Sequence, residues 1–136
     1  MRMRIGIMMA GLSLLVVQAP VLGHHSFAAE FDDKSPVTLR GVVMKVEWTN
    51  PHAHILVAVR DDSGSTLTSW DLELGSPNVL LREGWTRDCL KEGDQVVVEG
   101  FRAKDGSNLA NARQVTLADG RKVFAGSSLG DNAKGK

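Results

Sequence analysis

Cysteine is nearly absent from this chain of 136 residues, which contains only Cys89. A single cysteine cannot form an internal disulfide, so a disulfide-stabilised small domain is excluded. The neighbours of Cys89 form no reactive-thiol motif, and we interpret it as a small buried apolar residue. The fold must therefore be held together by its hydrophobic core.

Tyrosine and net charge are also missing. The chain has no tyrosine and 5% aromatic residues, and its 16 basic residues balance 16 acidic ones. Such a surface gives no electrostatic reason to bind the phosphates of nucleic acids or the headgroups of anionic lipids. We therefore expect no nucleic-acid partner.

Recognisable catalytic motifs are absent as well. The sequence contains no Gly-x-Ser-x-Gly nucleophile elbow, no cysteine–histidine signature and no phosphate-binding loop. Pairs of carboxylates can be chosen from 16 acids in many ways, so they indicate no particular reaction. The sequence predicts a non-enzymatic protein.

One long hydrophobic run is present, at the amino terminus. Arg2 and Arg4 precede an uncharged stretch from Ile5 to Leu22, and Val21-Leu22-Gly23 offers small or branched residues before a processing site. This order is typical of a cleavable secretory signal, which we assign to residues 1–23. An uncleaved anchor is the alternative, since about 20 apolar residues span a bilayer.

Cleavage after Gly23 leaves 113 residues, 24–136, and removes two arginines, so 14 basic residues face 16 acidic ones for a net charge of −2. A chain of this length has room for one domain. The expected localisation is periplasmic or secreted, with no stable membrane anchor after cleavage.

The rest of the chain carries the short β-branched and alternating runs that are typical of strands. The predicted strands cover residues 37–48, 52–60, 66–74, 95–102, 108–117 and 121–124. Gly41 permits a bulge or a tight curl within the first of them. Between the third and fourth, Ser76 is a candidate N-cap, Pro77 suits the first helical position and Gly84 suits a helix end.

Three strands, a short helix and two further strands with a trailing hairpin are the element order of an OB-type Greek-key barrel. We predict a mainly all-β fold of this type, with five strands and one short helix between strands 3 and 4. A small β-sandwich is the alternative. The predicted division is a signal peptide 1–23, a leader 24–36, an OB-like barrel domain 37–125 and a disordered tail 126–136.

Several motifs resemble those of a family of small exported bacterial proteins. They are His24-His25-Ser26-Phe27, Trp48-Thr49-Asn50-Pro51-His52, Gly75-Ser76-Pro77-Asn78, Gly84-Trp85-Thr86-Arg87-Asp88 and Ala103-Lys104-Asp105-Gly106-Ser107-Asn108. That family is a domain of unknown function, and the resemblance runs from about His24 to Ser128. It implies an exported β-barrel-like domain, and it carries no established activity or catalytic residues.

The four histidines fall in two pairs, His24-His25 and His52/His54. Cleavage after Gly23 makes His24 the first residue, so its α-amine and imidazole can chelate one metal ion together. Cleavage one residue earlier would place His25 third, which also forms a Cu(II)-chelating terminus. His52 and His54 are two apart on a predicted strand and therefore share a face. Such a set of nitrogen ligands suits copper first and zinc second.

Both pairs also have an interpretation without a metal. Adjacent histidines near a terminus can simply be solvated, and a His-x-His on a strand can be a half-exposed face. His52 could equally cap backbone amides. The spacing of 27 residues between His25 and His52 permits the pairs to meet and does not require it.

Two further groups of residues are candidates for binding. Glu30, Asp32 and Asp33 could complete a metal site beside the first histidine pair, or form a solvated acidic leader. Trp48 and Trp70 each neighbour a carboxylate residue, as in sugar-binding clefts, and are candidate ligand-binding residues. Packing in the core or at a barrel end is the alternative for both tryptophans.

The leading hypothesis is an exported binding protein that holds a transition metal, copper or zinc, through His24, His25, His52 and His54. The alternative is an accessory or scaffold module of the cell envelope that binds a partner protein or a small ligand without metal. The expected partner is thus a metal ion or an envelope protein. The sequence indicates no oligomeric state.

Overall fold

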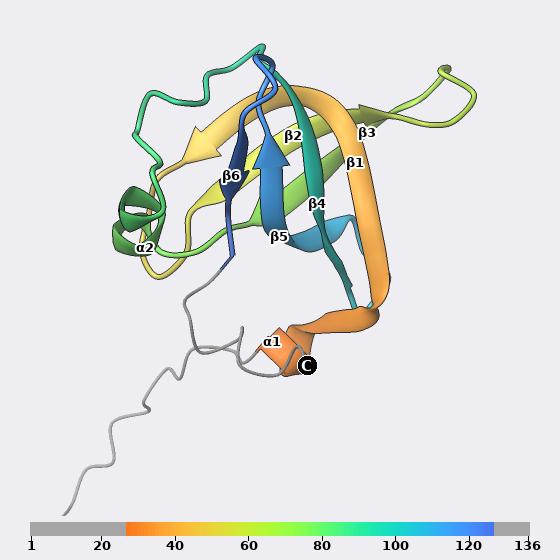
Figure 1. The fold of residues 1–136 in the computed structure, drawn as a ribbon. Helices are drawn as coiled ribbons and strands as arrows, with labels where there is room; N and C mark the ends of the chain where they lie inside the picture. The colour runs from red at the N-terminus through yellow and green to blue at the C-terminus, as the bar shows by residue number, and fades with distance from the viewer. Residues whose placement is uncertain (1–26, 127–136) are drawn as a thin grey trace, which may run out of the picture.

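The structure is a computed structural model that describes residues 27–126, which form six strands and two short helices (Figure 1). Their bounds are α1 Phe27–Glu30, β1 Phe31–Glu47, β2 His54–Arg60, β3 Leu67–Glu73, α2 Pro77–Arg82, β4 Gln95–Ala103, β5 Leu109–Thr116 and β6 Lys122–Phe124. Neither of these helices is long and apolar enough to cross a membrane. The predictions for the signal 1–23, for His24 and His25 and for the tail beyond residue 126 lie outside the described residues.

The strands form one sheet in the order β3-β2-β1-β4-β5-β6. Neighbours in this order are antiparallel, and an additional parallel pairing joins β3 to β5. The first five strands are therefore paired in a closed ring, which is the connectivity expected of the OB type. The prediction of a mainly β fold with one short helix between the third and fourth strands is confirmed.

The strand β1 serves two partners, because it pairs with β4 along its first part and with β2 along its second. Gly41 takes part in both pairings. A Cβ atom at Gly41 would overlap the carbonyl oxygen of Ala58, so only glycine allows this close approach. The register shift lies nearby, between Val43 and Lys45. Together these features let β1 bend around the sheet, as Figure 1 shows.

The first strand begins earlier than the sequence indicated. We predicted a start at Val37, whereas β1 begins at Phe31, which pairs with Ala103 before the ladder resumes at Pro36. Between these points the Asp32 carboxylate accepts two hydrogen bonds, one from the backbone N–H two residues later and one from the serine hydroxyl three residues later. This polar turn interrupts the ladder without ending the strand, so the later half of the predicted leader is strand.

The helix α2 lies where its capping residues predicted it. The Ser76 hydroxyl accepts a hydrogen bond from the backbone N–H of Val79 at 3.4 Å, and Pro77 opens the helix. Gly84 follows the helix with a φ of 97°, a conformation that favours glycine. Leu80 is fully buried, so α2 packs onto the core.

The core consists of the inward-facing side chains of the strands and of the α2–β4 connection. Its most deeply buried members include Trp85, Ile55, Leu72, Leu80 and Val98. The indole N–H of Trp85 donates to the carbonyl oxygen of Phe124 at 2.7 Å, which ties this connection to β6. Cys89 is partly buried against the same core, in agreement with its interpretation as an apolar packing residue.

Candidate functional site

His52 and His54 lie on one outer face of the sheet, at the point where β2 begins. Ala53 between them is buried, and its backbone exchanges hydrogen bonds with Leu74 and Gly75 just after β3. Since side chains alternate along a strand, a buried Ala53 directs both histidines outward. The two rings therefore share a face, as their spacing predicted.

Each imidazole is held through its Nδ1 atom by an oxygen of β3 or of the residue after it. His52 Nδ1 lies 3.0 Å from the carbonyl oxygen of Leu74. His54 Nδ1 lies 2.8 Å from a carboxylate oxygen of Asp71. Metal-binding histidines usually have one ring nitrogen held in this way, which fixes the orientation and the tautomer of the ring. In this tautomer Nε2 carries the lone pair that a metal ion needs.

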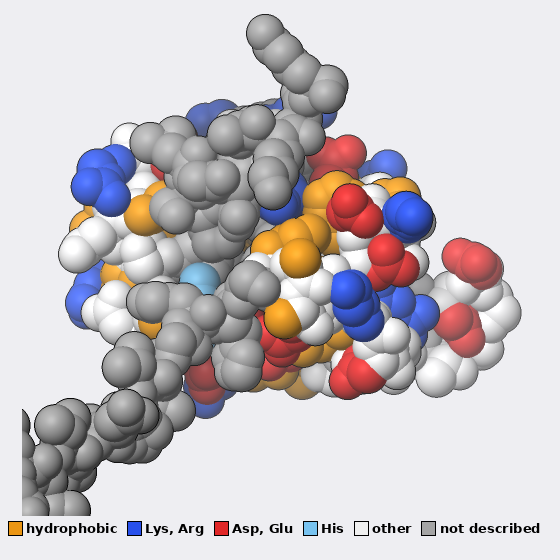
Figure 2. Space-filling model, turned by 90° about the horizontal axis from the view of Figure 1, so that it is seen from below, with side chains coloured by type: hydrophobic (Ala, Val, Ile, Leu, Met, Phe, Trp, Pro, Cys, Tyr) orange, Lys and Arg blue, Asp and Glu red, His pale blue; other side chains and the backbone are white. Residues whose placement is uncertain are grey.

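Glu73 lies at the centre of the same face. The strand register places it opposite His54 on β2 and opposite Asn111 on β5. Its side chain is 15% exposed, and its Oε1 atom lies 3.9 Å from His52 Nδ1. We call His52, His54, Glu73 and Asn111 the histidine row. Figure 2 shows a histidine and several acidic side chains on the face seen from below.

Asn111 is the buried polar residue of the row, with 1% of its surface exposed. Its amide nitrogen lies 3.5 Å from Glu73 Oε1, while its Oδ1 atom has no hydrogen-bond partner in residues 27–126. A buried acceptor left without a donor costs about 1–3 kcal/mol. A ligand or a segment that donates to this oxygen would remove that cost.

The charges around the row favour a cation. The hydrogen bond to Asp71 raises the pKa of His54, because the carboxylate stabilises the protonated ring. Burial raises the pKa of Glu73, and the nearby carboxylate of Glu30 raises it further, while His52 and His54 act in the opposite direction. The carboxylates of Asp71, Glu73 and Glu47 therefore act on His54, and that of Glu30 acts on Glu73.

The chain enters this region through α1. The ring of Phe27 stacks on Phe31 and meets Phe101 edge-on, with both pairs of ring centroids 5.7 Å apart. The guanidinium of Arg113 lies 4.8 Å from the centre of the same ring. Phe101 is the register partner of Asn111, which belongs to the histidine row. Through its contact with Phe101, Phe27 therefore lies beside this row.

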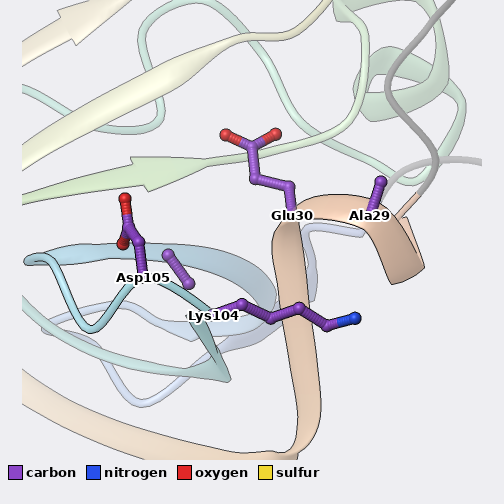
Figure 3. Close-up of a pocket in the computed structure, with 5 residues that line it drawn as sticks. Ala29, Glu30, Lys104 and Asp105 are labelled. Carbon is purple, nitrogen blue, oxygen red and sulfur yellow. The ribbon is translucent and has the colours of Figure 1, made fainter.

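Lys104 fastens α1 to the turn between β4 and β5. Its backbone N–H donates to the carbonyl oxygen of Glu30 at 2.8 Å, and its ammonium group donates to the carbonyl oxygen of Ala28. These contacts border a small pocket of about 350 Å³ lined by Ala29, Glu30, Ala103, Lys104 and Asp105. In Figure 3 the carboxylates of Glu30 and Asp105 point to one side of it, and Lys104 reaches toward α1.

The fold separates the acidic cluster that the sequence suggested. Glu30 interacts electrostatically with Glu73. Asp32 instead accepts the hydrogen bonds of its own turn, and Asp33 is exposed. Of the three acids, Glu30 is therefore the one that the structure places near the histidine row.

The two tryptophans proposed as ligand-binding residues lie against the core. Trp70 is 8% exposed and belongs to the core cluster, with the guanidinium carbon of Arg102 5.1 Å from its ring centre. Trp48 is partly buried and packs against the same cluster. These contacts correspond to the packing alternative.

Asp71, Glu73 and Asn111 were not predicted as site residues. The sequence did contain a signal for the two acids, because they alternate with Trp70 and Leu72 and so share the outer face. Their position beside the histidines depends on the β2–β3 register, and that of Asn111 depends on the β3–β5 pairing. Neither pairing can be deduced from a local pattern.

Residues 27–126 contain no group of three or more His, Cys, Asp or Glu side chains arranged to hold a metal ion. Within this part of the chain, His52 and His54 can thus supply only part of a coordination shell. The other predicted ligands, His24 and His25, lie outside the described residues.

No curated protein sequence matches the chain. The model of a family of unknown function (DUF6152) matches residues 12–112, which include the whole histidine row and most of the sheet. The chain therefore belongs to this family of unknown function, DUF6152.

Proposed function

We propose that this protein is an exported, non-enzymatic metal-binding protein that holds a transition metal, copper first and zinc second, through His24, His25, His52 and His54. The observation that carries the proposal is the fixing of both strand histidines through Nδ1. Acceptors on Nδ1 orient the rings so that Nε2 is the ligating atom, as in established metal sites. Imidazole and amine nitrogens favour Cu(II), with Zn(II) second.

The docking of Phe27 gives the amino-terminal histidines a short path to the row. Consecutive Cα atoms are about 3.8 Å apart, so the Cα of His25 lies within about 8 Å of that of Phe27, and that of His24 within about 11 Å. Phe27 itself packs on Phe101, the register partner of Asn111. These limits permit the two histidine pairs to share one ion.

Charge supports the same proposal. Glu73 is mostly buried beside two imidazoles, and burial raises the pKa of its carboxyl. A divalent cation nearby would stabilise the ionised carboxylate, because opposite charges attract more strongly where water is partly excluded. Glu30 and Asp71 add negative charge around the same position.

Export would supply one further ligand. Arg2 and Arg4, the uncharged run that follows and the small residues before His24 support removal of residues 1–23 in a secretory pathway. The motifs shared with small exported bacterial proteins also support export to the periplasm or beyond. Cleavage after Gly23 frees the α-amine of His24, which adds a nitrogen next to its imidazole.

The test is calorimetric titration of the processed chain, residues 24–136, with Cu(II) and with Zn(II). We expect a 1:1 complex with Cu(II) whose Kd lies well below about 10 μM. The His52→Ala/His54→Ala variant should bind at least about tenfold more weakly. Acetylation of the α-amine of His24 keeps all four imidazoles and removes the terminal chelate, so the acetylated chain should also bind Cu(II) more weakly.

The control is Asp61→Asn, which changes a carboxylate in the turn after β2, at the end of that strand remote from His54. It should leave the affinity unchanged. Uptake no tighter than about 10 μM by the processed wild type would overturn the metal-binding function. Unchanged Cu(II) affinity in the double histidine variant would confine the site to the terminus and overturn the shared site.

A further inference from the structure

A groove of about 800 Å³ lies on the outer side of the bent strand β1. It is lined by parts of β1, β2 and β4 and by residues at the start of β3 and the end of β5. It borders Ala58 and Arg60, toward the opposite end of β2 from His54, about 13 and about 20 Å along the strand from that histidine. Its volume is in the range of small-molecule sites, about 300–1,000 Å³.

The floor of the groove is apolar and exposed. Val42 and Leu67 line it with 40% and 59% of their surfaces exposed, which makes them two of the four large hydrophobic residues exposed in residues 27–126. Ala58 on β2 lies between them, and Val97 on β4 extends the apolar surface on the other side of β1. Covering such side chains with an apolar ligand is favourable, by about 25 cal/mol for each Å² removed from water.

Two arginines, Arg40 and Arg60, line the same groove, and Arg60 Nη1 also donates to the carbonyl oxygen of Gly64 in the turn after β2, at 3.1 Å. The β1–β2 pairing ends at Gly41 and Val59, and Arg40 and Arg60 are the next residues beyond it on the two strands. None of the lining residues is acidic, and across residues 27–126 neither guanidinium takes part in an ion pair. Like charges directly opposite on neighbouring strands are destabilising, and an anion between them would remove the repulsion.

Along the floor of this groove, the strand β1 offers no unpaired backbone edge. At Gly41 and Val42, β1 is hydrogen-bonded to β2 on one side and to β4 on the other. A peptide therefore cannot add a strand to β1 here, which is the usual way a sheet recognises an extended chain. Recognition must come from the side chains, which supply an apolar surface and two guanidinium groups.

We propose that this groove binds a fatty acid, with its carboxylate between Arg40 and Arg60 and its unbranched chain along Val42 and Leu67. Guanidinium groups bind carboxylates through paired, charge-assisted hydrogen bonds. The site is separate from the histidine row and does not depend on metal.

The test is titration of the processed protein with dodecanoate, kept below micelle formation and with EDTA present, followed by amide NMR shifts. We expect saturable binding with a Kd below about 100 μM and shifts centred on Val42, Leu67 and Val97. Arg40→Gln/Arg60→Gln should weaken binding at least about tenfold. Leu67→Asn should weaken it as well, and the matched control Arg87→Gln, on an exposed residue of the α2–β4 connection, should not.

Two comparison ligands test the two halves of the recognition. Acetate has the carboxylate without the chain, and dodecyl maltoside has the chain without the charge, so each should bind at least about tenfold more weakly than dodecanoate. Equal binding of either one would overturn the proposal, as would shifts centred elsewhere or no saturation below about 1 mM. Thermal melting without ligand checks that the double arginine variant folds, since removing two neighbouring positive charges should leave Tm close to that of the wild type.

Discussion

Glutamine at position 73 would keep the volume of the glutamate side chain and remove its charge. The Glu73 side chain is 15% exposed, and burial raises its pKa above the ordinary value of 4.5, so the folded protein holds the ionised carboxylate at a cost. Glutamine can still accept the N–H of Asn111. Because solvent and the neighbouring imidazoles screen part of the charge, we expect Glu73→Gln to stabilise the metal-free protein by about 1 kcal/mol at pH 8.

The effect should depend on pH in a defined direction. A pKa that is raised on folding means that the folded state favours the protonated form of Glu73. Below the unfolded value of 4.5 both states hold the proton, and the charge costs nothing. The cost develops as the pH rises through the folded pKa. The gain from Glu73→Gln should thus be close to zero at pH 4 and complete at pH 8.

The same substitution should weaken metal binding. Loss of a carboxylate that supports the ligating histidines typically reduces metal affinity about 10- to 100-fold. Opposite effects on stability and on affinity would identify Glu73 as a residue that serves binding at the expense of the fold. The assays are urea unfolding of metal-free protein at pH 4 and pH 8, and calorimetric titration with Cu(II).

Glu99→Gln is the matched control, because Glu99 is an exposed glutamate on β4. It should change neither quantity appreciably. Lower stability of Glu73→Gln at pH 8 would refute the reasoning from buried charge. Copper affinity equal to that of the wild type would remove Glu73 from the surroundings of the ion.

Three other substitutions test the fold and the hydrogen bonds of the site. Asp71→Asn should lower the pKa of His54, measured by NMR titration, because the carboxylate that stabilises the protonated ring is removed. The same variant should lose under about 1 kcal/mol of stability below pH 6.5, and this loss should vanish as the pH rises through the folded pKa of His54. An unchanged pKa of His54 would contradict the pairing. Trp85→Phe should cost about 1–3 kcal/mol in urea unfolding, because the partly buried carbonyl of Phe124 loses its donor and the smaller ring leaves space in the core. A neutral result would mean that the bond contributes nothing. Ser76→Ala should cost about 1 kcal/mol by the same measurement through loss of the helix cap, with Ser76→Asp as the variant that restores it.

The elements that the sequence predicted well are those specified by their own residues. Ser76, Pro77 and Gly84 mark both ends of α2, and each of them occupies its expected position. Gly41 indicated a bend in the first strand, and the structure shows why: a neighbouring backbone oxygen occupies the place of a side chain. Local chemistry therefore predicts helix caps, turns and the succession of strands along the chain, but not their order in the sheet.

The elements that the sequence did not predict depend on residues far apart in the chain. Phe31 begins β1 because it pairs with Ala103, and the polar stretch after Phe31 contains no pattern that predicts this pairing. Glu73 and Asn111 meet because β3 and β5 run side by side in parallel, which only the closed ring of strands determines. The histidines could be named from the sequence, and their neighbours could not.

The docking of Phe27 against Phe101 and Arg113, together with the bonds from Lys104 to α1, has a consequence for weak ligands. A group attached two or three residues before Phe27 is tethered to the sheet at an effective concentration on the order of millimolar. Imidazoles that bind an ion poorly when separate can then act as one multidentate ligand. An ion bound in the proposed way would need no rigid, preformed cage, because the tether would replace much of the preorganisation.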